Sequence, residues 1–81
     1  MGKLRVQIVN PEKKVFDGEA GMVIVRAVTG EMGVLPGHAA LVAVLDAWPV
    51  RILKDEREVQ FDVEGGILQV RPEGVTILTP G

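Results

Sequence analysis

The side chains able to carry out chemistry are few in this chain of 81 residues. Nucleophilic catalysis needs a hydroxyl or thiol within hydrogen-bond reach of a base, which in turn needs an orienting partner. The sequence has no serine, cysteine or tyrosine, so the hydroxyls come only from Thr29, Thr76 and Thr79. Its single histidine is His38. These residues form no recognisable nucleophile–base set, and we predict no catalytic residue and no enzymatic activity.

Metal and cofactor sites are not predicted either. A single histidine without cysteine falls short of the usual zinc ligand set, and no cluster of oxygen ligands stands out. The sequences G-E-M-G at 30–33 and P-G-H-A at 36–39 lack the G-K-[ST] that completes a phosphate-binding loop. Glu56 and Glu58 lie in a charged run that is typical of a solvated hairpin. We therefore expect no cofactor and no metal.

The most informative stretch is Thr29 to Leu41, which reads T-G-E-M-G-V-L-P-G-H-A-A-L. Pro36-Gly37 favours a turn, because proline presets φ and glycine accepts a positive φ. The apolar residues here are too few and too interrupted for a long helix. The pattern indicates two tight bends around a very short extended piece, exposed at one end of a β domain.

Three side chains in or near this stretch each allow two interpretations. Glu31 is either a solvated turn carboxylate or a contact with a basic or polar patch on a partner. His38 is either a turn histidine with a local hydrogen bond or a partner contact. Trp48 lies beside Pro49 near an expected bend, where it either packs against the domain or contributes to an interface.

Length and charge favour one soluble domain over residues 1–81. A chain of this size buries only about 60–65% of its unfolded surface, so its core is modest. The net charge of −2 gives no reason to expect nucleic-acid binding. No apolar run approaches the roughly 20 residues of a membrane span, and no signal peptide is recognisable at the start.

Short apolar segments predict the strands that position the central stretch. Residues 4–8 alternate between apolar and polar, which is typical of a half-buried strand. The clearest alternation runs through Val59, Phe61 and Val63, whose side chains we expect to share one buried face. Met22–Val25 is a continuous apolar run that fits a strand covered on both faces or one that crosses a sandwich corner.

Turn signals divide the rest of the chain. Leu41–Leu45 is continuous and apolar, and Pro36 and Pro49 leave little room there for the helix that periodicity alone would permit. Gly65-Gly66 predicts a turn, and Asp17-Gly18 predicts either a hairpin turn or a bulge. Eight or more short strands, with turns about every 8–12 residues, predict an all-β sandwich or barrel.

The order of several motifs carries a resemblance to a known family. The chain resembles the N-terminal domain of the epsilon subunit of F-type ATP synthases, which is called delta in mitochondria, over essentially its whole length. The most specific match is G-E-M-G-V-L-P-G-H-A at 30–39, and F-D-V-E-G-G-I-L-Q-V at 61–70 is a second, independent one. Shorter matches are N-P-E-K-K-V-F-D-G-E at 10–19, V-R-I at 50–52 and G-V-T-I-L-T at 74–79.

The resemblance implies a fold and a role. The fold is all-β, a flattened sandwich or barrel of about ten short strands in two sheets. The role is that of a non-catalytic subunit of the rotating central stalk, bound to the gamma subunit and the ring of c subunits, which couples ion-driven rotation to ATP synthesis. Neither nucleic acid nor direct membrane insertion is implied. The complex is peripheral, on the cytoplasmic face of the bacterial inner membrane or the stromal or matrix face in an organelle.

Two groups of contact residues are implied by the same resemblance. One group matches the family's loop that approaches the polar loops of the c ring, and the other matches the face near gamma. The c-ring contact is expected at Gly30, Glu31, Met32 and Gly33, and the gamma contact at His38, Ala39, Leu41 and Val42.

The sequence also departs from the family pattern. Family members usually continue into a C-terminal pair of helices, which would begin where this sequence stops, at 79–81; a trimmed domain and an unusually short member both fit. The inhibitory role of that pair is not carried over. Ala27 and Thr29 stand where the family tends to have a glycine and an acidic residue, and residues 46–48 stand where it tends to read K-P-G.

Two other classes of function fit the composition less closely. One is a generic β-sandwich adaptor that binds another protein through the same stretch. The other is a small sugar- or ligand-binding barrel, for which the aromatic residues Phe16, Trp48 and Phe61 are few. Co-purification with gamma separates the adaptor from the stalk subunit.

Overall fold

The computed structural model describes residues 2–80, which form an all-β domain without a helix. This confirms the fold class, and nine strands are found where slightly more were expected. The strands are β1 (Leu4–Val9), β2 (Lys14–Ala20), β3 (Met22–Ala27), β4 (Gly30–Val34), β5 (Leu41–Leu45), β6 (Val50–Lys54), β7 (Arg57–Phe61), β8 (Gly66–Arg71) and β9 (Gly74–Leu78).

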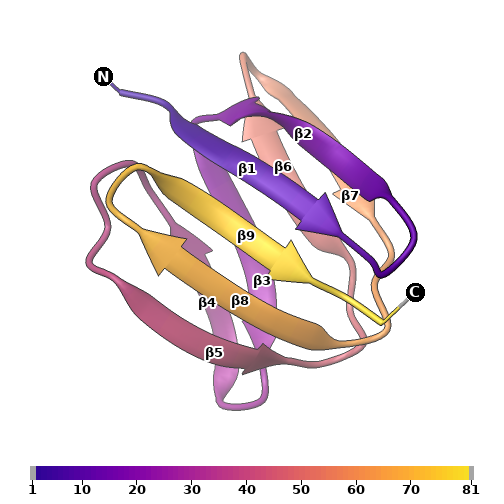
Figure 1. Cartoon of the computed structure of the whole chain (residues 1–81). Helices are drawn as coiled ribbons and strands as arrows, with labels where there is room; N and C mark the ends of the chain where they lie inside the picture. The colour runs from indigo at the N-terminus through magenta and orange to yellow at the C-terminus, as the bar shows by residue number, and fades with distance from the viewer. Residues whose placement is uncertain (1, 81) are drawn as a thin grey trace.

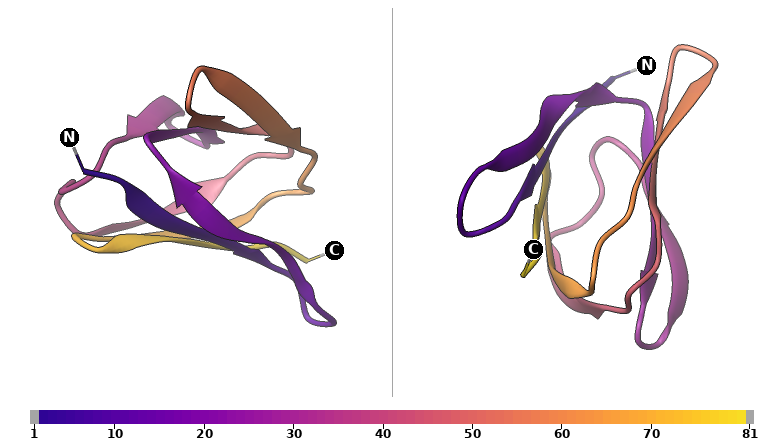
Figure 2. Two further views of the ribbon diagram at one scale, coloured as in Figure 1. Left: turned by 90° about the horizontal axis from the view of Figure 1, so that it is seen from above. Right: turned by 90° about the vertical axis from the view of Figure 1, so that its right-hand side faces the viewer.

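The strands lie in two layers that face each other (Figures 1 and 2). The first layer has the strand order β2-β1-β9-β8-β5, and the second has the order β4-β3-β6-β7. Neighbouring strands are antiparallel except β1 and β9, which run parallel. Parallel neighbours cannot be joined by a tight turn, and here strands β2 to β8 lie between them in the sequence.

The two layers are joined at a corner formed by β3 and β5. On one side β3 pairs with β4, and on the other it pairs first with β6 and at its end with β5. The Val28 N–H donates to the Val44 carbonyl at 3.0 Å, and the Asp46 N–H donates to the Arg26 carbonyl at 2.9 Å. Neither interpretation of Met22–Val25 holds fully: these residues alternate in burial within the second layer, and the strand reaches the corner only at its end, from Arg26 onward.

Alternate residues of the strands fill the space between the layers. Ile8, Ile77 and Leu68 are direct neighbours across β1, β9 and β8, and none of the three is exposed. Burying a side chain of this kind contributes about 1.5–3 kcal/mol. The buried apolar residues are Leu4, Val6, Ile8, Ala20, Val23, Val25, Ala27, Val34, Leu45, Val50, Ile52, Val63, Leu68, Val70, Val75 and Ile77.

The Asp17-Gly18 turn prediction is wrong. Both residues lie inside β2, where they pair with Gln7 and Val6 of β1. Gly18 has close contact with the ring of Phe16, because a Cβ there would lie 3.0 Å from the ring and the ring would have to shift slightly. The chain reverses earlier, at 10–13, and the register of the pair slips once near the end of β1.

The expected burial of Val59, Phe61 and Val63 on one face is also wrong in part. Val63 is buried beyond the end of β7, but Phe61 is half-buried and Val59 is 43% exposed. The reason is that β2 and β7 end the strand order without pairing, so the sandwich has an open seam there. Phe16 and Phe61 meet across the seam with ring centroids 5.1 Å apart.

Candidate functional site: two interaction surfaces

The residues expected to contact a c ring lie on β4, which pairs only with β3 among the described strands. The expected short extended piece between two bends is confirmed, with turns at 28–29 and 36–37 on either side of it. Side chains alternate along the strand. Glu31 is exposed on the outer face of the second layer, whereas Met32 packs against the core. Within Gly30, Glu31, Met32 and Gly33, only Glu31 therefore offers an exposed side chain to a partner.

Arg26 lies directly opposite Glu31 in the β3–β4 pair. Its guanidinium carbon is 5.0 Å from the ring centroid of Trp48, within the range of a cation–π interaction. Trp48 is 50% exposed at the bend between β5 and β6. Trp48 therefore packs against Arg26 at the edge of the domain and not in the core, and a role of its exposed ring at an interface stays a prediction.

A second arginine of the same face is bound to another carboxylate. Arg51 on β6 donates to Glu58 on β7 at 3.0 Å, and Gln60 donates to the same carboxylate at 2.7 Å. These hydrogen bonds, Arg51 first, lower the pKa of Glu58, and the pKa of Arg51 is raised mainly by Glu58. The negative charge of Glu31 adds to the rise in the pKa of Arg51, which places Glu31 within its electrostatic reach.

The residues expected to contact gamma begin in the turn after β4. The His38 N–H donates to the Leu35 carbonyl at 3.1 Å, and its Nδ1 lies 2.9 Å from the Ala39 carbonyl oxygen. His38 is half-buried and Ala39 is exposed. His38 therefore makes the local contacts of a turn histidine and keeps part of its ring accessible.

Leu41 and Val42 follow on β5 and point to opposite faces. Leu41 packs against the core, while Val42 is 68% exposed on the outer face of the first layer. The predicted gamma residues are thus only partly brought together: Val42, His38 and Ala39 reach the surface, and the side chain of Leu41 supports them from within.

An apolar row that the sequence reasoning missed continues from Val42 across the first layer. Val44, Ile67, Leu78 and Val9 are direct neighbours across β5, β8, β9 and β1. Val44 is 52% exposed and Leu78 is also exposed, with Ile67 and Val9 half-buried. We call these four residues the apolar row. The alternation of Val42 and Val44 along β5 was the available signal, but their neighbours lie far away in the sequence.

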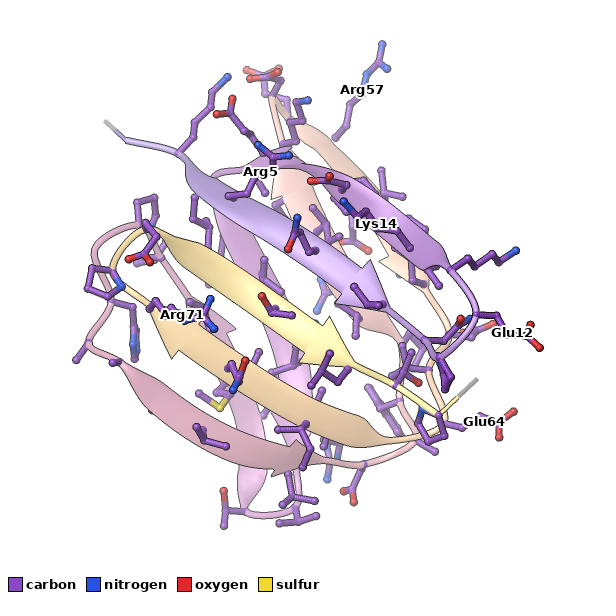
Figure 3. The ribbon with its side chains drawn as sticks, viewed as in Figure 1. Arg5, Glu12, Lys14, Arg57, Glu64 and Arg71 are labelled. Carbon is purple, nitrogen blue, oxygen red and sulfur yellow. The ribbon has the colours of Figure 1, made fainter. Side chains whose placement is uncertain are left out.

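The remainder of this outer face becomes polar and then charged. Figure 3 shows Arg5 on β1 and Lys14 on β2. Asp17 accepts a hydrogen bond from Arg5 at 2.7 Å and one from Lys14 at 2.9 Å. These two bonds, Arg5 first, hold the pKa of the Asp17 carboxyl well below its usual range. The apolar row is consequently confined to one part of the face.

The two candidate surfaces lie on different layers. Glu31 is on the outer face of the second layer, and Val42 with the apolar row is on the outer face of the first. Within residues 2–80, no group of three or more histidine or acidic side chains is placed to hold a metal ion. The geometry suits the binding of two partners from two sides.

The family follows from a match over nearly the whole chain. Residues 3–81 match the family model described as ATP synthase, Delta/Epsilon chain, beta-sandwich domain. The chain belongs to this family. The two motifs from which the resemblance was inferred lie within the matched region, and the sandwich of the family description is the fold observed.

Curated relatives support the same assignment. The ATP synthase epsilon chain of Alkalihalophilus pseudofirmus is 50% identical over 78 residues, which cover 96% of this chain and 59% of the relative. That of Brevibacillus brevis is 46% identical over 79 residues, covering 96% of this chain and 60% of the relative. The chain thus spans well under two thirds of these relatives. The epsilon chain of Frankia casuarinae differs: 76 residues at 43% identity cover 93% of this chain and 89% of the relative.

Solved structures share the fold. The chain superposes on a chain of the Euglena gracilis mitochondrial ATP synthase OSCP/F1/c-ring structure with a TM-score of 0.92 and 21% identity, covering all of this chain and 52% of that one. A chain of the Tetrahymena thermophila mitochondrial ATP synthase central stalk/c-ring structure gives a TM-score of 0.78 at 20% identity, covering 99% and 65%. At these identities the likeness concerns the fold. Within residues 2–80 no helix has the length and apolarity to cross a membrane.

Proposed function

We propose that this epsilon-family domain is a non-catalytic part of the rotating central stalk of an F-type ATP synthase. It binds the gamma subunit on one side and the c ring on another, so that rotation of the ring is passed to the stalk. The observation that carries the proposal is the pair of exposed surfaces on opposite layers of one sandwich. A single rigid core between two contact surfaces is what a mechanical coupling element needs.

The gamma surface consists of Val42, His38, Ala39 and the apolar row. An exposed row of β-branched and aliphatic side chains across four strands is unusual for a surface in water and favours burial in an interface. Leu41 belongs to this contact indirectly, because it packs under the strand that presents Val42.

The c-ring surface is centred on Glu31. The edge of β4 and Gly30, which has open space where a Cβ would stand, leave the backbone accessible on one side of the carboxylate, whereas the Met22 side chain lies over Gly33 and Met32 anchors the strand to the core. A carboxylate at such a position meets a basic or polar patch on its partner and acts on orientation and on-rate. The assembled complex is peripheral, on the cytoplasmic face of a bacterial inner membrane or the equivalent face of an organelle membrane.

The test is a binding experiment with matched charge variants. Val42→Lys should weaken binding to purified gamma by about tenfold or more, because an unpaired charge would be buried in an apolar contact. Glu31→Lys should leave binding to gamma alone unchanged and weaken binding to a gamma–c-ring assembly. Glu12→Lys, an exposed change in the β1–β2 turn, is the control and should do neither.

The results of these binding experiments test the gamma surface and distinguish a stalk subunit from a generic adaptor. Retention of parent affinity for gamma by Val42→Lys would overturn the gamma surface. Failure of the parent domain to bind gamma at all would remove the stalk assignment and leave the generic adaptor. A thermal melt of each variant shows whether a loss of binding is a loss of folding, and for these exposed positions the melting temperature should hardly change.

A further inference from the structure

Among the described residues, Glu31 forms no ion pair, although two arginines share its face. Arg26 stands directly opposite it across β3 and β4, where Cβ atoms lie about 4.5–5.5 Å apart. Arg51 stands opposite Ile24, two residues from Arg26 along β3 and on the same face, and the negative charge of Glu31 makes the smallest contribution to raising the pKa of Arg51. Oppositely charged residues in such positions commonly form ion pairs. Yet among residues 2–80 the ion pairs are Arg5–Asp17, Lys14–Asp17 and Arg51–Glu58, and none includes Glu31.

Each arginine is held by a different group. The guanidinium of Arg26 lies over the ring of Trp48 at 5.0 Å from the centroid. The bend that carries Trp48 is tied to the same strand, because the Asp46 N–H donates to the Arg26 carbonyl at 2.9 Å. The ring is therefore fixed beside the arginine that it covers.

The other arginine is held by a carboxylate that is itself fixed. Arg51 donates to Glu58 at 3.0 Å, and Gln60 on the same strand donates to the second oxygen of Glu58 at 2.7 Å. On the outer face of the second layer, Trp48 thus engages Arg26 and Glu58 engages Arg51.

We propose that Trp48 and Glu58 are positioning residues that hold Arg26 and Arg51 off Glu31, so that its carboxylate stays available to a hydrogen-bond donor or cation of the partner at the edge of β4. The inference rests on the proposed c-ring contact for its purpose, but the positioning itself is a property of this chain alone. Without the Trp48 ring, Arg26 becomes free to pair with Glu31, which stands directly opposite it in the β3–β4 pair. That pair then competes with the partner.

The positioning can be measured without any partner. A double-mutant cycle combines Arg26→Gln with Glu31→Gln and follows the unfolding of the domain in denaturant. In the parent, the effects of the two substitutions on the free energy of unfolding should add. In Trp48→Leu they should become coupled by about 1.5- to 5-fold in the unfolding equilibrium constant, the range for exposed ion pairs. Trp48→Phe keeps an aromatic face and should remain additive.

Two results of this cycle would overturn the proposal. One is coupling between Arg26 and Glu31 already present in the parent, and the other is additivity that persists in Trp48→Leu. If Trp48→Leu does not fold, Glu58→Gln tests the same idea at the other arginine, because it should strengthen the coupling between Arg51 and Glu31 relative to the parent.

Binding to a gamma–c-ring assembly supplies the second measurement. Trp48→Leu should weaken it by about the same 1.5- to 5-fold, since a competing pair reduces the fraction of free carboxylate. Adding Arg26→Gln should restore binding, which a merely structural role of Trp48 would not allow. Weakened binding that Arg26→Gln fails to rescue contradicts the proposal.

The two hypotheses fail in different ways. If Glu31→Gln binds the assembly as the parent does, the c-ring contact is wrong, and the unfolding cycle still reports whether Trp48 holds Arg26. If Glu31→Gln weakens binding but the cycle shows no change of coupling with Trp48→Leu, the contact stands and the positioning is wrong.

Discussion

The two outer faces of the sandwich differ in how they could recognise a partner. The first layer presents the apolar row, four side chains in register with no charge between them. The second layer presents Arg26 against Trp48, Arg51 paired with Glu58, and the exposed carboxylate of Glu31, which forms no ion pair within residues 2–80. An apolar contact gains from buried area, whereas a charged contact at a rim gains mainly in orientation and on-rate. One core therefore supports two different kinds of docking.

The alternation along single strands makes this possible. On β5 the side chains of Leu41 and Leu45 point into the core, while Val42 and Val44 point outward. On β4 the same alternation separates Met32 from Glu31. A shift of one residue in either strand would exchange core and contact residues. The side chains that each outer face presents thus depend on the register of the strands in the core beneath it.

The largest expected effect comes from the core that both faces share. Leu68→Ala should destabilise the domain by about 2–5 kcal/mol, the range for truncating a fully buried leucine. Because a small domain has only about 5–15 kcal/mol in total, binding at both faces should fall together at elevated temperature. Denaturant unfolding measures the loss. A value below about 1 kcal/mol would show that the layers do not depend on this contact.

A smaller loss of folding stability is expected from a substitution at the open seam between β2 and β7. Phe61→Ala should destabilise the domain by about 1–3 kcal/mol, less than a buried phenylalanine would, because the ring is half-buried and meets Phe16 across a gap. The same denaturant experiment compares it with Leu68→Ala. A loss larger than that of Leu68→Ala would mean that the seam is closed in solution.

Binding at the two faces should differ in its dependence on salt concentration. Raising the salt concentration from about 0.05 to 0.5 M should weaken the Glu31-dependent part of binding by about two- to fivefold, because exposed charges are screened. Binding to gamma alone should change little, since the apolar row carries no charge. Equal salt dependence of both contacts would contradict the assignment of a charged contact to one face and an apolar contact to the other.

The smallest effect concerns the charged end of the first layer. Asp17 has a lower pKa in the folded domain than in the unfolded chain, so its ionised form stabilises the fold above about pH 3.9, and this contribution is lost as the pH falls below that value. Stability measured from pH 5 to 2 should fall less steeply in Asp17→Asn than in the parent. Identical pH profiles would show that the Arg5 and Lys14 contacts do not stabilise the fold.

Local patterns in the sequence predicted most of the strands, because their causes are local. Alternation located β1 and β8, but the turn predicted at Gly65-Gly66 is wrong. Both glycines have positive φ, yet Gly65 ends the segment that leads from β7 to β8, and Gly66 is the first residue of β8. Two errors had non-local causes. Asp17 and Gly18 lie inside a strand because they pair with Gln7 and Val6 of β1, and the half-burial of Phe61 depends on β2 and β7 remaining unpaired.

The candidate site was predictable only where a motif was continuous. The G-E-M-G and P-G-H-A segments led directly to Glu31 and His38 through the family resemblance. The apolar row could not be found in this way, because its members come from four strands and meet only through their register. The cation–π contact of Arg26 with Trp48 likewise depends on the corner between β3 and β5.

The most direct test of the two-surface account uses the absence of cysteine from the chain. Single-cysteine variants Val42→Cys and Glu31→Cys carry a short photoactivatable cross-linker and are reconstituted into the ATP synthase. We predict that Val42→Cys cross-links to gamma and Glu31→Cys to a c subunit, each without the other, while Glu12→Cys cross-links to neither. Cross-linking of both positions to the same subunit, or of neither position to gamma or c, would contradict the account.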